Sequence, residues 1–174
     1  MNRDTLIQRI KDTAYLEGDF TLRSGRKSKY YLDKYLFETQ PDVLRALGEA
    51  FAVHVGESTT LIAGAELGGV ALAAATSLAT GKPFVIIRNA KKDYGTGKPY
   101  EGKIVDGDSV LLVEDIATTG GQVLEAAKVI QGVGAKVERI VAVIDRMEGA
   151  RENIEAAGFI FESLLTKHDL GITE

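Results

Sequence analysis

The sequence predicts an α/β fold with a mainly parallel central sheet flanked by helices. Two observations indicate it. From residue 59 onward, short apolar segments alternate with segments of helical periodicity. The apolar segments are also continuous instead of alternating with polar residues, which is typical of parallel strands buried on both faces. By length we expect residues 1–174 to form a single domain.

The first 58 residues are predicted to form two helices and a hairpin. Residues 3–17 indicate an amphipathic helix that Gly18 ends. Its apolar positions are Leu6, Ile7, Ile10, Ala14 and Leu16. The segment FTLRSGRKSKYYLD, residues 20–33, surrounds a Ser-Gly turn with β-forming residues and favours a short hairpin or extended arm. Pro41 suits the first turn of a second helix. The apolar face of that helix is formed by Val43, Leu44, Leu47, Phe51 and Val55.

The rest of the chain alternates between strands and helices, with one exception. Strands are expected at residues 59–64, 83–88, 109–115, 136–145 and 159–165, and helices at 67–80, 120–135 and 149–158. Residues 89–107, NAKKDYGTGKPYEGKIVDG, do not follow this alternation, because they are polar, glycine-rich and basic at their start. So long a connection within a compact domain is more often a functional lid than a spacer. We expect a mobile catalytic loop, and one alternative is that it closes as a short two-stranded ribbon.

Composition excludes several classes of function. The net charge of −4 gives no global attraction to nucleic acid or to an anionic membrane. The absence of cysteine excludes disulfides, thiolate metal sites and a cysteine nucleophile. No apolar run approaches the roughly 18 residues of a membrane-spanning helix, and the N-terminus lacks the apolar core of a signal peptide. We therefore expect a cytoplasmic protein.

The stretch VLLVEDIATTGG, residues 110–121, carries the main chemical signal. An apolar strand ends in Glu114 and Asp115, and a glycine-rich turn then leads into a helix. Ligands of open α/β sheets bind beyond the carboxyl ends of the strands, and the N–H groups of a helix N-terminus attract phosphate. The hydroxyls of Thr118 and Thr119 add donors. Two carboxylates beside an anion site make sense if they face hydroxyl groups, and a ribose 5-phosphate offers both groups.

This stretch resembles the phosphoribosyl diphosphate (PRPP) signature of type I phosphoribosyltransferases. Three further segments resemble those of orotate phosphoribosyltransferases in particular. FTLRSGRKSKYYLD is similar to the N-terminal substrate segment, placed within residues 1–40. RNAKKDYGTG, from Arg88, is similar to the mobile basic loop, and VIDRMEG, from residue 143, to a strand-end Asp-Arg. The order and spacing of the four segments agree over nearly the whole chain.

The resemblance implies a reaction and an assembly. Ribose 5-phosphate would pass from PRPP to N1 of orotate, giving orotidine 5′-monophosphate and diphosphate, a step of UMP biosynthesis. The cofactor would be Mg²⁺, held mainly by substrate oxygens and water and not by a protein cage. The chain would form a homodimer in which the loop at residues 89–107 reaches the neighbouring site.

The resemblance also implies roles for individual residues. The catalytic positions would be Arg88, Lys92 and Asp115. PRPP would be bound by Arg88, Asn89, Lys92, Glu114, Asp115, Ile116, Ala117, Thr118, Thr119, Gly120, Gly121 and Gln122. Orotate would be bound by Thr118, Arg146, Tyr31 and Leu32, and the turn GAELGG, residues 64–69, would meet the diphosphate. An arginine suits the carboxylate of orotate because it can form a bidentate pair.

Three positions depart from the family pattern. Asn89 and Arg23 stand where many members have a lysine, and Tyr94 stands where many have a histidine. The positive charge near the diphosphate is therefore reduced at Asn89. Three lysines can substitute in part, namely Lys91, Lys92 and Lys98.

Some alternatives remain open at this point. Arg146 could simply pair with Asp145 or Glu148. Transfer to another base is disfavoured by Arg146 and by the N-terminal segment. A PRPP-sensing regulator is disfavoured because no helix-turn-helix segment is added to this acidic chain. GTGK at residues 95–98 lacks the spacing of a nucleotide-binding P-loop, which excludes that motif.

Overall fold

The computed structural model describes residues 1–21, 25, 27–89 and 97–173. Its centre is a six-stranded sheet of order β5-β4-β3-β6-β7-β8. The strands are β3 (Leu61–Ala65), β4 (Phe84–Ile87), β5 (Tyr100–Glu101), β6 (Ser109–Ala117), β7 (Lys136–Asp145) and β8 (Phe161–Thr166). All neighbouring strands pair in parallel except β4 and β5, which are antiparallel. The predicted mainly parallel sheet is confirmed.

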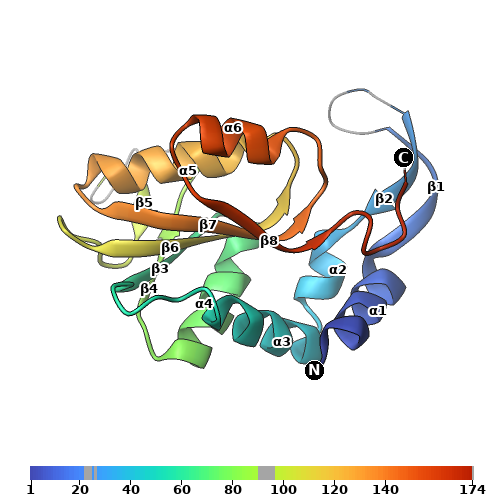
Figure 1. Cartoon of the computed structure of the whole chain (residues 1–174), viewed down its shortest axis with the longest axis horizontal. Helices are drawn as coiled ribbons and strands as arrows, with labels where there is room; N and C mark the ends of the chain where they lie inside the picture. Colours follow the sequence, from blue (N-terminus) through green and yellow to red (C-terminus); the bar gives the residue numbers. More distant parts are fainter. Residues whose placement is uncertain (22–24, 26, 90–96, 174) are drawn as a thin grey trace.

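Helices cover both faces of this sheet (Figure 1). The helices α5 (Gly121–Gly132) and α6 (Ala150–Ala156) lie on one face, and α3 (Pro41–Ala52) and α4 (Gly68–Thr80) lie on the other. Successive strand residues therefore enter different apolar clusters. Ile62 packs in the cluster beneath α3 and α4, whereas Leu61 and Ala63 pack in the cluster beneath α5. Burial on both faces explains why these strands are apolar along their whole length.

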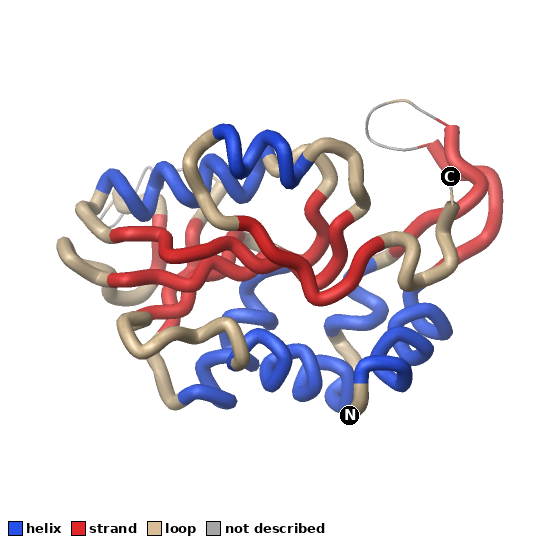
Figure 2. The backbone as a smooth tube through the Cα atoms, in the orientation of Figure 1, coloured by secondary structure: helices blue, strands red, loops and turns tan. Residues whose placement is uncertain are grey.

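The N-terminal residues form a separate unit of helix, hairpin and helix. It consists of α1 (Arg3–Ala14), β1 (Tyr15–Thr21), β2 (Lys27–Leu32) and α2 (Lys34–Glu38). The two strands pair antiparallel, which confirms the predicted hairpin. Figure 2 shows this hairpin projecting beyond the central sheet, and the labels and strand arrows of Figure 1 place it on the side toward which β6 and β7 run. The N-terminal unit therefore stands beside the carboxyl ends of the central strands.

The predicted end of the first helix is wrong. The helix ends at Ala14, and Tyr15, Leu16 and Gly18 belong to β1, where Leu16 is exposed. The physical reason is pairing between distant residues. The carbonyl of Ala14 accepts a hydrogen bond from the Asp33 N–H at 2.9 Å, and Tyr15 pairs with Leu32. This hairpin pairing overrides the helical spacing.

Two further elements differ from expectation. The five-residue helix α2 was not predicted, because it is too short to show helical periodicity. The second predicted helix, α3, ends at Ala52, so Val55 lies beyond it, although Val55 still packs against the core. Pro41 occupies the first turn of α3 as expected.

The described part of the 89–107 segment closes onto the sheet. Tyr100 pairs with Ile87, and the Arg88 N–H donates to the Pro99 carbonyl at 2.9 Å. In the described residues the antiparallel pairing is between β5 and β4, so one of the two strands lies before residue 89. Lys91, Lys92 and Tyr94, and also Arg23, lie outside the described residues. In the described ranges, no helix is long and apolar enough to span a bilayer.

Candidate active site

A cavity of about 430 Å³ opens at the carboxyl end of β6. The chain passes from β3 out to β4 and then crosses back to β6 on the other side of β3, so the strand order reverses here. Such a reversal is where open α/β sheets bind ligands. The cavity is lined by Tyr31, Lys34, Glu114, Asp115, Ile116, Ala117, Thr118, Thr119, Gly120, Gly121, Gln122 and Val123. The nine consecutive residues predicted to bind PRPP, Glu114 to Gln122, thus lie together in one cavity.

The acidic pair is buried inside β6, which extends two residues further than predicted, to Ala117. Glu114 is 6% exposed and Asp115 is 2% exposed. Burial, followed by the charge of Asp115, raises the pKa of Glu114 well above its usual range. Its Oε2 atom has no hydrogen-bond partner among the described residues. The acidic pair is therefore not a solvated strand end, and the raised pKa suits Glu114 to donate a hydrogen bond to a ligand oxygen.

The Asp115 carboxylate already has partners on both oxygens. Its Oδ1 accepts a hydrogen bond from the Ile116 N–H at 2.5 Å. Its Oδ2 lies 2.5 Å from the Nζ of Lys34, the first residue of α2. This ion pair joins the N-terminal unit to the central sheet at the cavity.

The turn after the acidic pair leads into a helix with free donors. Gly120 precedes α5 with φ of 78°, a left-handed conformation that favours glycine, and no side chain caps the first turn of the helix. The Thr119 carbonyl accepts from Asn153 Nδ2 of α6 at 2.9 Å, which fixes the turn. Uncapped N–H groups at a helix N-terminus are an anion site.

The turn at residues 64–69 lies against Asp115 at Gly68 and is closely packed within itself at Gly64. A Cβ on Gly68 would lie 1.5 Å from Asp115 Oδ2, and a Cβ on Gly64 would lie 2.1 Å from the Gly69 carbonyl oxygen. No larger residue fits either position without movement. The turn also contains a cis peptide bond between Glu66 and Leu67.

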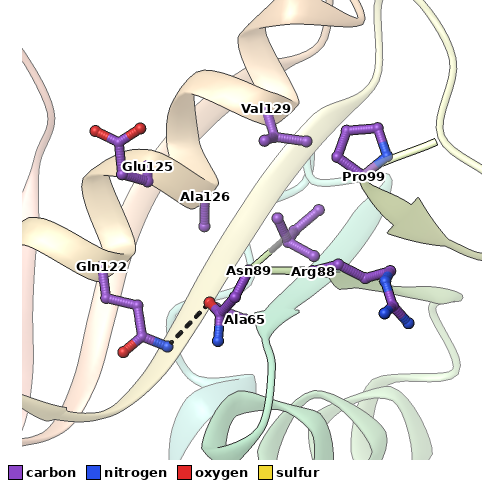
Figure 3. Close-up of a pocket in the computed structure, with 9 residues that line it drawn as sticks. Ala65, Arg88, Asn89, Pro99, Gln122, Glu125, Ala126 and Val129 are labelled. Atoms are coloured by element: carbon purple, nitrogen blue, oxygen red, sulfur yellow. Dashed lines mark hydrogen bonds between the residues drawn. The ribbon is translucent and has the colours of Figure 1, made fainter. Parts of the chain in front are cut away.

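Asn89 ties this turn to α5. Its backbone N–H donates to Glu66 Oε1 at 2.8 Å, and its Nδ2 donates to the Glu66 carbonyl at 3.0 Å. Gln122 Nε2 donates to the same carbonyl at 2.9 Å and lies 3.4 Å from Asn89 Oδ1 (Figure 3). The neutral amide of Asn89 therefore has a structural role, because its hydrogen bonds connect the turn to α5.

Arg88 lies in an adjoining cavity of about 350 Å³, between the end of β4 and α5 (Figure 3). Its Nη1 is 3.5 Å from Glu101 Oε1 on β5. Gln122 lines both cavities. The described PRPP positions are therefore divided between two cavities that meet at Gln122.

The four positions predicted for orotate are not gathered in one cavity. Thr118 and Tyr31 line the larger one, whereas the Leu32 side chain is buried in the core. Adjacent strand residues point to opposite faces, so only the backbone of Leu32 is available to a ligand there.

Arg146 follows β7 beside this cavity without lining it. Its Nη2 is 3.0 Å from Glu148 Oε1 and donates to the Tyr30 hydroxyl at 3.1 Å, and its guanidinium lies 5.6 Å from the Tyr30 ring centre. The alternative of pairing with Glu148 is therefore confirmed as a contact. Its Nε is buried and has no hydrogen-bond partner among the described residues, which leaves a donor for a ligand.

Two charged residues at the site were missed. Lys34 contacts Asp115, and Glu38 of the same helix is 3% exposed. Burial, followed by the charge of Asp115, raises the pKa of Glu38 to about 8. Their four-residue spacing was the available signal. Among the described residues, no three His, Asp or Glu side chains are grouped to hold a metal ion.

Comparison with known proteins places the chain in a family. Residues 36–171 match the phosphoribosyl transferase domain, so the chain belongs to the phosphoribosyl transferase family. An orotate phosphoribosyltransferase of Natronomonas pharaonis is 44% identical over 171 residues, 98% of each chain. The chain is a member of the orotate phosphoribosyltransferases within that family.

Solved structures agree in fold. The Mycobacterium tuberculosis H37Rv orotate phosphoribosyltransferase in complex with Fe(III) dicitrate superposes with a TM-score of 0.89 at 32% identity, covering 98% of this chain and 99% of that one. The same enzyme in complex with PRPP gives a TM-score of 0.83 at 31% identity, with the same coverage of 98% and 99%.

Proposed function

We propose that this chain transfers ribose 5-phosphate from PRPP to N1 of orotate, giving orotidine 5′-monophosphate and diphosphate. The observation that carries the proposal is the pairing of two buried acids with an uncapped helix N-terminus in one cavity. A ligand with a phosphate at one end and a vicinal diol at the other satisfies both. The orotate phosphoribosyltransferase relatives and the PRPP complex of one of them support the choice of substrates.

The 5-phosphate is held by the turn at residues 116–121, whose N–H groups and threonine hydroxyls donate. Glu114 and Asp115 hold the ribose hydroxyls. Because the pKa of Glu114 is raised and Asp115 is ion-paired, we expect one acid to donate and the other to accept. This division of roles suits hydroxyl groups, which are donors and acceptors at once.

The diphosphate lies toward Arg88, Asn89 and the turn at residues 64–69, and Lys92 completes this end. Breaking the bond at C1′ builds negative charge on the diphosphate and positive charge on the ribose. Cations at the leaving oxygens and a carboxylate beside the sugar stabilise both charges. Arg88 is held near Glu101 and would exchange this partner for the diphosphate.

Orotate meets Thr118, Tyr31, Arg146 and the backbone of Leu32. The buried Nε of Arg146 is the donor that supports recognition of the orotate carboxylate. Its contact with Tyr30 holds the guanidinium against the hairpin that carries Tyr31.

Mg²⁺ fits this site as an ion that accompanies PRPP. The cavity offers carboxyl and hydroxyl oxygens in place of sulfur or imidazole nitrogen, and oxygen is the donor that Mg²⁺ prefers. The ion would be held mainly by substrate oxygens and water, and when bound it would neutralise charge on the diphosphate.

The assembly we propose is a homodimer whose loop at residues 89–107 reaches the neighbouring site. Residues 1–40 would serve as a substrate-covering segment within the single domain of residues 1–174. The cytoplasmic location stays a prediction.

An orotate absorbance assay with PRPP and Mg²⁺ tests the proposed reaction. We expect the orotate signal to fall, and no signal change with uracil, adenine or hypoxanthine in its place. An unchanged orotate signal at high enzyme concentration would contradict the proposal. Consumption of a purine instead would assign the chain a different acceptor.

A further inference from the structure

Lys34 is the one cation among the described residues that contacts the acidic pair. It is the first residue of α2, and its Nζ lies 2.5 Å from Asp115 Oδ2. The Lys34 side chain is 28% exposed and the Asp115 side chain is 3% exposed. Lys34 also lines the 430 Å³ cavity, beside Tyr31. This contact therefore faces the space that we assign to the ribose of PRPP.

Three carboxyl groups crowd around this single ammonium group. Asp115 and Glu114 come from β6, and Glu38 lies four residues after Lys34 on α2. All three are buried. Like charges so close together in a buried site cannot all be ionised. The geometry therefore gives the negative charge to the carboxyl that touches the ammonium, which is Asp115.

The protonation states of the neighbours agree with this division. Burial raises the pKa of Glu38 and of Glu114, and in each case the charge of Asp115 raises it further. Burial disfavours the charged form of Lys34, but the attraction of Asp115 outweighs it, so the pKa of Lys34 lies above its ordinary value. The other titratable groups facing the cluster are Asp33, which acts on Glu38, and Tyr35, which lies beside Lys34.

The position of Lys34 is fixed by its surroundings. Asp33 caps α2 by accepting from the Tyr35 N–H at 3.1 Å. The Lys34 ammonium lies 5.3 Å from the centre of the Tyr35 ring, a cation–π contact. On the opposite side, Gly68 lies directly against Asp115 Oδ2, where any side chain would collide with it. The carboxylate is thus held between α2 and α4.

We propose that Lys34 is a positioning residue for PRPP, which orients the Asp115 carboxylate as an acceptor for the ribose hydroxyls. The inference rests on the proposed function of this cavity. Lys34 acts through Asp115 and is not assigned a contact with the reacting atoms.

The test compares the binding of ribose 5-phosphate and 2-deoxyribose 5-phosphate by calorimetry, without any acceptor base. The wild-type protein is expected to prefer the ribose ligand by about tenfold, because a hydroxyl bound to a charged acceptor is a strong hydrogen bond. In Lys34→Met this preference is expected to fall to about twofold, since the Asp115 carboxylate then loses the ammonium group that orients it as an acceptor.

Two variants serve as controls. Lys34→Arg keeps the charge and is expected to keep most of the ribose preference. Lys128→Met removes an exposed lysine that pairs with Glu125 on α5, and it should leave both affinities unchanged. If Lys34→Met does not fold, Lys34→Gln has a side chain of similar length and replaces it in the test.

Equal weakening of both sugars in Lys34→Met, or no weakening of either, overturns the proposal. The first result would mean a general loss of site structure, and the second would mean that Asp115 needs no counter-cation. If instead the proposed reaction were wrong, the measurements would give a different result. The wild-type protein would then bind ribose 5-phosphate with the hydroxyl preference but leave orotate unconsumed.

Discussion

Asp115 is the residue that several elements of the site contact. It accepts the Ile116 N–H, pairs with Lys34 and lies against Gly68, so β6, α2 and α4 all meet at one carboxylate. The sequence predicted Asp115 from the motif around it. The contacts that hold it came from residues 47 and 81 positions away in the chain, which no local pattern links to it.

Asp115→Asn should lower kcat/KM for PRPP by about 10- to 100-fold, because the amide keeps the shape but loses a charged acceptor. The fold should remain intact by circular dichroism. Steady-state kinetics with varied PRPP measures the effect. Glu155→Gln on the exposed surface of α6 is the matched control, and kinetics equal to those of wild type in Asp115→Asn would refute the role.

Glu38 should make the stability of the protein depend on pH. Its pKa is about 8 in the folded chain, against an ordinary value of 4.5. An acid whose pKa is raised by folding holds its proton in the folded state while the unfolded state has lost it. The stability of the folded state therefore falls as pH rises from about 4.5 to 8.

Between pH 5 and pH 8, Glu38 alone should remove about 3 kcal/mol from the unfolding free energy. Glu38→Gln cannot ionise and should lack this loss, so its advantage over wild type should grow with pH. Urea unfolding at pH 5, 6.5 and 8 checks this. A difference between the two proteins that stays constant with pH would show that Glu38 is not buried in its protonated form.

At the scale of elements, the sequence predicts helices with a clear apolar period and strands that are continuously apolar. It does not predict very short helices. β3 and β6 were predicted because burial on both faces makes them apolar throughout. α2 was missed because five residues show no period, and with it Lys34 and Glu38 were missed as site residues. The end of α1 was wrong because the hairpin pairing of Tyr15 with Leu32 is a distant contact.

The turn at residues 64–69, which leads into α4, allows a prediction at this scale. Gly68→Ala adds a Cβ at 1.5 Å from Asp115 Oδ2 and must displace the carboxylate. Because such overpacking costs about 1–3 kcal/mol, PRPP affinity should fall by about tenfold or more. Titration calorimetry with PRPP measures it.

Gly132→Ala at the end of α5 is the matched control, since its Cβ would meet nothing within 4 Å. It should bind PRPP as wild type does. Unaltered PRPP affinity in Gly68→Ala would mean that Asp115 moves freely, contrary to the packing between α2 and α4.

At the scale of the whole molecule, the sequence predicted the sheet and the cavity but not how charges are shared within it. Glu114 and Asp115 read as two equal acids in the sequence. In the structure Asp115 is ion-paired with Lys34, whereas burial and the charge of Asp115 raise the pKa of Glu114 well above its usual range. The difference depends on burial and on Lys34, which only the folded chain supplies.

The proposed dimer gives a test by subunit mixing. Lys92→Ala disables the loop of its own subunit, and Asp115→Asn disables the cavity of its own subunit. If the loop acts on the neighbouring site, a mixed dimer has one site with both parts intact. Refolding the two impaired variants together should raise the rate at limiting PRPP to roughly a quarter of the wild-type rate for random pairing of a symmetric dimer.

Each variant refolded alone is the control for this mixing and should show only its own residual rate. Absence of any recovery, with mixed dimers shown to be present by mass spectrometry of differently tagged chains, would mean that the loop serves its own subunit.

The ion pair between α2 and β6 also determines how much of the N-terminal segment can be exchanged without loss of PRPP affinity. The hairpin carries two of the four residues assigned to the acceptor, Tyr31 and Leu32, and none of those assigned to PRPP. Exchanging the N-terminal segment is therefore one way to alter the acceptor while the PRPP residues stay unchanged. The boundary for such an exchange is not the end of the N-terminal unit. It lies after Leu32, because Lys34 acts together with Asp115 of the sheet. A chimera joined after Leu32 should keep PRPP affinity. A chimera joined after Thr39, whose N-terminal segment comes from a protein without this lysine, should lose PRPP affinity. Equal PRPP affinities of the two chimeras would place the boundary elsewhere.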